Sequence, residues 1–96
     1  MNAITIGENP NYKIFVGTGS MYTQEFYVHA ENEADALAFI ADYCEKNDMH
    51  WLYADHYELF DLCDAGETVA EYAARQDLTA CGESGVYMQI KGIEEI

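Results

Sequence analysis

The sequence predicts an α+β domain with the element order ββαβαβ, extending over residues 1–96 as a single compact unit. Three observations lead to this prediction. Two neighbouring segments near the start alternate between apolar and polar residues, which is the period of a half-buried strand. Two later segments repeat apolar residues at helical spacing, and the final segment alternates again. We expect a mostly antiparallel sheet of about four strands, with both helices packed on one of its faces.

The first two strands are predicted at residues 12–16 and 25–30. Between them, Gly17, Gly19 and Ser20 indicate a turn, so the two runs should form a hairpin. The inward-facing side chains of the two strands are Tyr12, Ile14, Val16, Phe26, Val28 and Ala30.

A helix should follow and cover the apolar face of this hairpin. Asn32 is a typical N-cap, and Asn47 is a plausible end. Its apolar stripe consists of Leu37, Ile40, Ala41 and Cys44. Phe39 falls on the opposite, charged side of the helix, so a large ring is predicted to face water. Either a partner or a later segment of the chain would cover this ring.

Residues 48–64, DMHWLYADHYELFDLCD, mix aromatic rings with carboxylates. Composition favours a strand at 50–55, extended as a strand or bent hairpin through Leu62, although neither a strand period nor a helical period separates the acids from the rings. A turn at 64–66 should end it. The stretch contains no Lys or Arg, and burying its carboxylates unpaired would be very costly. One side of it must therefore face water or a partner.

The remaining chain predicts a second helix and a last strand. Thr68 and Glu71 have the spacing of a capping box, and the helix should run to about Gln76. Gly82 and Gly85 bracket a turn. The run at 86–91 then alternates, with Val86, Met88 and Ile90 inward, before an acidic tail of Glu94 and Glu95.

The charge balance restricts the possible partners. Eighteen acids against four bases give a net charge of −14, while half of the residues are hydrophobic. We therefore expect a folded, soluble protein whose negative field repels nucleic acids and anionic membranes and attracts basic protein surfaces. The first ten residues have neither the basic region nor the apolar region of a signal peptide, so we expect the protein to stay in the cytoplasm.

Residues that could carry chemistry are few and widely spaced. Three cysteines at wide spacing suit reduced, structural thiols better than a disulfide framework. The histidines form no zinc-binding motif, although His50, Asp55 and His56 would converge on a cation if the predicted strand were bulged. No glycine belongs to a phosphate-binding loop. We predict no enzymatic activity, no cofactor and no metal.

The predicted contact surface combines acids and aromatic rings. Seven acids and no base occur from Asp48 to Glu71. Carboxylates on a rigid fold can occupy the positions of phosphates, while aromatic rings are favoured at the centre of interfaces. The plainer interpretation is a solvated acidic surface that keeps the protein soluble and monomeric. The predicted partner-binding residues are Phe39, Asp48, Trp51, Tyr53, Asp55, Tyr57, Glu58, Asp61, Asp64, Glu67 and Glu71.

The opening segments YKIFVGTG and EFYVHAENEADALAFI, together with the short length and acidity, resemble small phage or mobile-element proteins. Anti-CRISPR and anti-restriction inhibitors are among these. The resemblance is one of overall character, and such inhibitors share no signature from which a residue's role could be transferred. It implies a host-defence effector as partner, blocked at a basic nucleic-acid-binding groove.

The leading hypothesis is a non-enzymatic inhibitor, monomeric or a small homo-oligomer, that binds a basic and nucleic-acid-handling protein. One alternative is a structural or assembly protein that self-associates through Phe39 and the exposed hairpin. A further alternative is a small thiol or metal-dependent enzyme.

Overall fold

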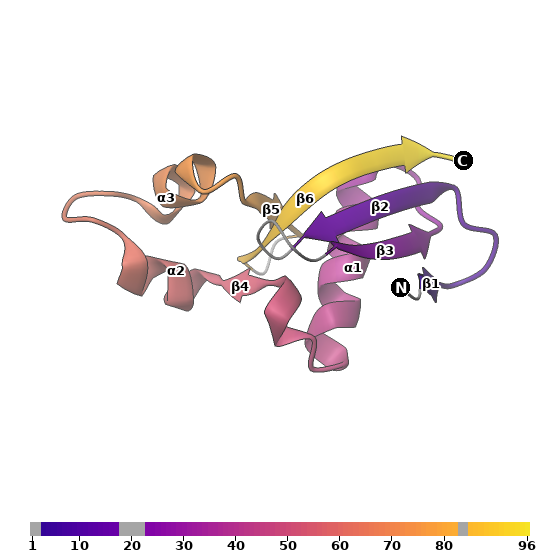
Figure 1. Ribbon diagram of the computed structural model, residues 1–96, viewed down its shortest axis with the longest axis horizontal. Helices are drawn as coiled ribbons and strands as arrows, with labels where there is room; N and C mark the ends of the chain where they lie inside the picture. Colours follow the sequence, from indigo (N-terminus) through magenta and orange to yellow (C-terminus); the bar gives the residue numbers. More distant parts are fainter. Residues whose placement is uncertain (1–2, 18–22, 83–84) are drawn as a thin grey trace.

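The structure is a computed structural model that describes residues 3–17, 23–82 and 85–96. Within these residues the chain is α+β, with three α-helices and a mixed six-stranded sheet (Figure 1). The strands are β1 (Ile4–Ile6), β2 (Tyr12–Gly17), β3 (Thr23–Val28), β4 (Ala54–Asp55), β5 (Thr79–Cys81) and β6 (Val86–Glu95). The helices are α1 (Glu33–Lys46), α2 (His56–Leu62) and α3 (Val69–Arg75), with a 3-10 turn, η1, at His50–Leu52.

The sheet has the order β1-β3-β2-β6-β4, and β5 also pairs with β6. β1 is parallel to β3, and the other pairs are antiparallel. The predicted hairpin is confirmed, because β2 and β3 pair from Tyr12 with Val28 to Gly17 with Thr23. The turn residues Gly19 and Ser20 lie outside the described residues. The two short strands β1 and β5 were not predicted.

The main hydrophobic core lies between α1 and one face of the sheet. All six side chains predicted to face inward from the hairpin region are buried, as is the whole predicted apolar stripe of α1. Asn32 caps α1, accepting a hydrogen bond from the Asp35 amide at 2.8 Å, and Asn47 ends the helix. The first helix is therefore confirmed in position and in the face that it buries.

Strand β6 is longer than predicted. It continues from Val86 to Glu95 because its second half pairs with β2 along the whole length of that strand. The register shifts between Phe15, which pairs with Gly92, and Val16, which pairs with Ile90. The prediction of an acidic tail was wrong, since Glu94 and Glu95 belong to the strand.

The structure contradicts the strand predicted at 50–55 and its extension through Leu62. Only β4 remains extended there, and α2 follows it directly. The physical reason is a helix cap. Asp55 has an extended backbone, and its side chain accepts a hydrogen bond from the Glu58 amide at 2.8 Å, which satisfies a free amide of the first helical turn.

The second predicted helix forms, but it does not pack on the sheet face that α1 covers. Thr68 and Glu71 make the predicted capping box, and α3 ends at Gln76 as its C-cap. α3 packs against α2, and Leu59, Val69 and Ala73 form a small second hydrophobic cluster. The prediction of two helices on one face was therefore wrong.

We call residues 56–78, which contain α2 and α3, the arm. Figure 1 shows the arm projecting from the end of the sheet, joined to it through β4 and β5. The molecule measures 45 × 27 × 23 Å, and its radius of gyration is 13.3 Å. A compact chain of this length would have a radius of about 12.5 Å. The arm accounts for the elongated shape.

The two hydrophobic clusters predict two levels of stability. Ile40→Ala should lower the free energy of unfolding by about 2–5 kcal/mol and speed amide exchange throughout the chain, because Ile40 is fully buried in the main core. Leu59→Ala should speed exchange mainly in residues 56–76. Hydrogen exchange with urea denaturation measures both. Equal acceleration of the β2 and β3 amides by Leu59→Ala would show a single cooperative unit instead.

Candidate partner-binding surface

Helix α2 exposes most of its large apolar side chains. Tyr57 is 81% exposed, Phe60 64% and Leu62 59%. Only Leu59 is buried on this helix, where it meets Val69 and Ala73. A helix of seven residues that packs on one side only leaves the rest of its surface to solvent. These three side chains therefore contribute little to the fold.

The same helix carries two acids and no Lys or Arg. Glu58 and Asp61 are exposed, and neither forms an ion pair with the described residues. Arg75 is the single Lys or Arg in the arm sequence. Its Nε donates to Glu67 Oε2 at 2.7 Å, and its Nη2 lies 3.7 Å from Asp64 Oδ2. Arg75 therefore pairs with Glu67 and Asp64, and not with the carboxylates of α2.

Several acids of the predicted surface hold the arm together. Glu67 accepts a hydrogen bond from the Asp64 amide at 3.0 Å as well as from Arg75, and these hydrogen bonds hold the pKa of Glu67 below its usual value. Glu71 completes the capping box with Thr68. Asp55 caps α2. Among the predicted contact acids of the arm, Glu58 and Asp61 are therefore the two without such a structural role.

Three predicted contact residues, Asp48, Trp51 and Tyr53, lie in or beside η1, at the body of the molecule. Trp51 is 57% exposed. Tyr53 is half-buried, and its hydroxyl lies 3.3 Å from His50 Nδ1, while His50 Nε2 lies 3.4 Å from Asp48 Oδ1. Burial, with the nearby carboxylates led by Glu45, raises the pKa of Tyr53. This group presents one large ring next to negative charge.

Phe39 lies on α1, at the body of the molecule, rather than on the arm. Its ring is 48% exposed, so the predicted exposure is confirmed. Sequence reasoning left Phe60 and Leu62 out of the contact surface. The spacing of Asp55 and Glu58, an N-cap followed three residues later by Glu, would have identified α2 and placed Tyr57 and Phe60 one turn apart on one helix.

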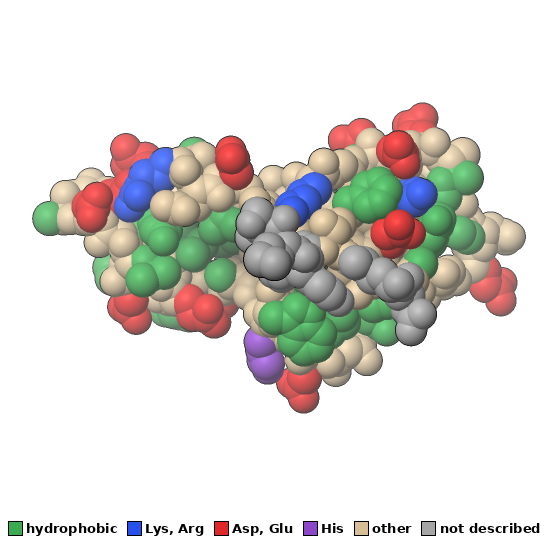
Figure 2. All heavy atoms as spheres, in the orientation of Figure 1, with side chains coloured by type: hydrophobic (Ala, Val, Ile, Leu, Met, Phe, Trp, Pro, Cys, Tyr) green, Lys and Arg blue, Asp and Glu red, His purple; other side chains and the backbone are tan. Residues whose placement is uncertain are grey.

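Negative charge alone does not distinguish the arm. Figure 2 shows Asp and Glu side chains around both the arm and the body on the face in view. On this face the acids are thus spread over both parts and do not gather in one patch. What distinguishes the arm is the combination of unpaired carboxylates with exposed apolar side chains on one short helix.

The thiols lie in environments that keep them protonated. Cys44 and Cys81 are fully buried, and burial raises their pKa values to about 12 and about 11. The half-buried Cys63 donates to the Leu59 carbonyl oxygen at 3.2 Å, and burial followed by the charge of Glu67 raises its pKa. A protonated thiol is a poor nucleophile and metal ligand. All three cysteines are free.

Within residues 3–17, 23–82 and 85–96, no group of three His, Cys, Asp or Glu side chains is placed to hold a metal ion, so His50, Asp55 and His56 do not form the cation site considered from the sequence. None of the helices in these ranges has the length and apolar character needed to cross a bilayer.

Comparisons of the chain with protein-family models, curated proteins and solved structures give no match.

The ion pair between Arg75 and Glu67, which closes the connection between α2 and α3, predicts a pH-dependent stability. The pKa of Glu67 is lowered in the folded state. Its contribution to the free energy of unfolding is therefore fully present above the ordinary carboxyl pKa of 4.5, and it is lost as the pH falls through the pKa of the folded state. Arg75→Gln should raise the Glu67 pKa towards 4.5, as read by NMR titration of its carboxyl carbon. Lys46→Gln, which removes an exposed pair with Asp42, is the control. An unchanged Glu67 pKa in Arg75→Gln would contradict the assignment.

Proposed function

We propose that this protein is a non-enzymatic, acidic binding protein that docks onto a basic surface of another protein through its arm. The observation that carries the proposal is α2, which exposes Tyr57, Phe60 and Leu62 beside the unpaired carboxylates of Glu58 and Asp61. Interfaces favour aromatic side chains at their centre and use complementary charge for steering and partner choice.

The energies indicate how large the contact must be. Full burial of a large apolar side chain contributes about 1.5–3 kcal/mol. The three apolar side chains of α2 are already partly covered, so burying the remainder contributes roughly 3–6 kcal/mol. Association costs about 4–15 kcal/mol in lost freedom of motion. The helix alone is therefore too small, and a contact that also includes Trp51 accounts better for binding.

Charge favours a basic partner over a second copy of the chain. A twofold pairing of α2 with itself would bring Glu58 and Asp61 of both copies close together. Like charges in one interface oppose binding. A basic partner instead neutralises these carboxylates while it covers the rings. Self-association through the exposed ring of Phe39 on α1 stays the alternative.

The class of partner that we propose is a nucleic-acid-handling defence protein, blocked at its nucleic-acid groove. Such grooves present Lys and Arg side chains arranged for phosphate, and carboxylates can pair with the same groups. The overall resemblance to small phage and mobile-element inhibitors supports this class. On this proposal the protein is an inhibitor that competes with the nucleic acid.

Charge reversal on α2 tests the proposal. Purified CRISPR effectors and restriction nucleases serve as the probes, and binding is measured by interferometry with and without a DNA duplex. We expect binding that the duplex displaces and that weakens steeply with added salt. The double variant Glu58→Lys and Asp61→Lys should bind at least about tenfold more weakly, since it reverses both free carboxylates of the contact.

The matched control is Glu8→Lys with Glu31→Lys, which changes the net charge by the same amount at exposed positions of the body. Asp55 is unsuitable for charge reversal because it caps α2. Equal weakening by both double variants would mean that only net charge matters, and absence of binding to every probe would reject the proposed class. Light scattering that shows a stable oligomer, dissociated by Phe39→Ser, would favour the alternative.

A further inference from the structure

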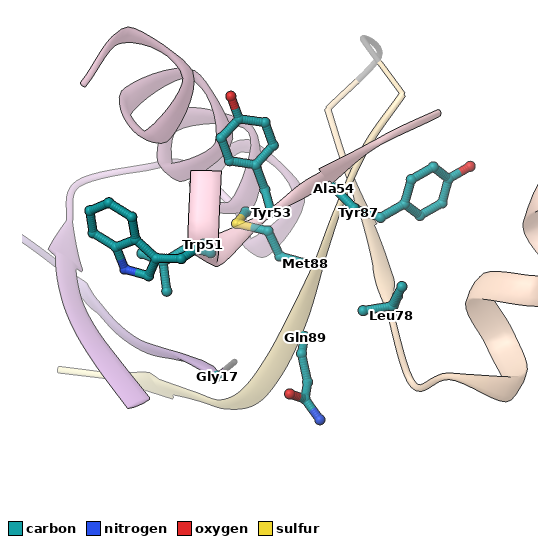
Figure 3. Close-up of a pocket in the computed structure, with 9 residues that line it drawn as sticks. Gly17, Trp51, Tyr53, Ala54, Leu78, Tyr87, Met88 and Gln89 are labelled. Carbon is teal, nitrogen blue, oxygen red and sulfur yellow. The ribbon is translucent and has the colours of Figure 1, made fainter. Parts of the chain in front are cut away.

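A small hollow lies where η1, β4 and the base of the arm meet strand β6. Its volume is about 200 Å³. Figure 3 shows Trp51 on one side of it and Leu78 on the other, with Met88 and Gln89 of β6 between them and Gly17 at its lower edge. Leu52, Tyr53, Ala54 and Tyr87 also line the hollow. The hollow thus opens between the body and the arm, the two parts assigned to the partner contact.

The size of the hollow restricts its occupant. Pockets that take cofactors or drug-sized molecules measure about 300–1,000 Å³. A volume of about 200 Å³ is below this range and suits one long side chain. An interface commonly anchors such a side chain in a pocket near its centre.

The lining and its surroundings favour a side chain with an apolar stem and a positive end. Leu52, Leu78 and Met88 give the hollow apolar walls. Trp51 is more than half exposed, and among the described residues its ring has no aromatic or cationic partner. Next to it in the chain, the His50 ring lies 3.4 Å from the Asp48 carboxylate. The exposed face of an indole attracts cations.

The charges near the hollow agree with this choice. The carboxylates of Glu45, Asp48 and Asp55 act on the neighbouring Tyr53, whose pKa is raised by burial first and by these charges second. The side chain of Lys91 lies against Gly17, at the lower edge of the hollow. A cation is therefore expected to enter from the Trp51 side.

We propose that this hollow receives an arginine side chain of the basic partner, with the guanidinium stacked on the exposed ring of Trp51 and the stem in the hollow. Arginine fits better than lysine because its planar head stacks on aromatic rings and is more weakly hydrated. The inference rests on the proposed function, since it names the group of the partner that the surface selects.

Trp51 is the single tryptophan of the chain, so its fluorescence reports on the hollow directly. The probe is N-acetylarginine amide, titrated at constant ionic strength. N-acetylcitrulline amide, which has the same shape without the charge, and N-acetyllysine amide are the controls. We expect a saturable change with the arginine compound, a weaker one with the lysine compound and none with the citrulline compound. An equal response to arginine and citrulline, or no saturable response to arginine, would overturn the proposal.

Two variants locate the site by amide chemical shifts, with folding checked by the dispersion of the spectrum. Trp51→Leu should weaken arginine binding about fivefold, the size of a cation–π contact, while Phe39→Leu should leave it unchanged. Equal weakening in both would place the binding elsewhere. Arginine binding is measured without the partner, so the hollow can fail this test while charge reversal on α2 still weakens partner binding, and the reverse also holds.

Discussion

The pairing of β6 with three other strands joins the two hydrophobic clusters of this protein. Its second half pairs with β2 and completes the sheet that α1 covers. Its first half has a strand on each edge, because Val86 and Tyr87 pair with both β4 and β5. The arm begins directly after β4 and ends directly before β5. Ala54 of β4 and Tyr87 of β6 also pack against the small cluster around Leu59, so this pairing helps to hold the cluster against the body.

The arm uses most of its charged groups to maintain its own structure. Arg75, Glu67 and Asp64 close the connection between its helices, while Thr68 and Glu71 cap α3. The exposed side chains of α2, in contrast, make little contribution to the folded structure. Its exposed apolar side chains lower solubility without adding to the core, which is understandable if a partner covers them.

Sequence reasoning located the elements whose polar and apolar residues separate cleanly. The alternation in β2 and β3 and the stripe of α1 were sufficient, because one face of each packs on the main core. The capping box of α3 was found from two residues. Strands β1 and β5 are only three residues long, too short for a period to be recognised.

The sequence predicted a strand where α2 forms, because the exposed side of this helix is apolar. The proposed role of α2 depends on the same exposed apolar side chains. A helix is recognised by an apolar stripe opposite a polar side, but Tyr57, Phe60 and Leu62 place apolar groups on the exposed side. The mixed pattern and the high strand propensity of aromatic residues then favoured a strand. The exposure of Phe39 and Trp51 was predictable, whereas the division of the acids into structural and free groups depends on hydrogen bonds that only the folded chain defines.

The footprint of a bound basic partner, mapped by hydrogen exchange, tests most directly whether α2 is the contact helix. The account predicts slower exchange in residues 56–62 and 50–53, with the β2 and β3 amides unchanged. Protection confined to α1 around Phe39, with α2 exchanging as in the free protein, would contradict it.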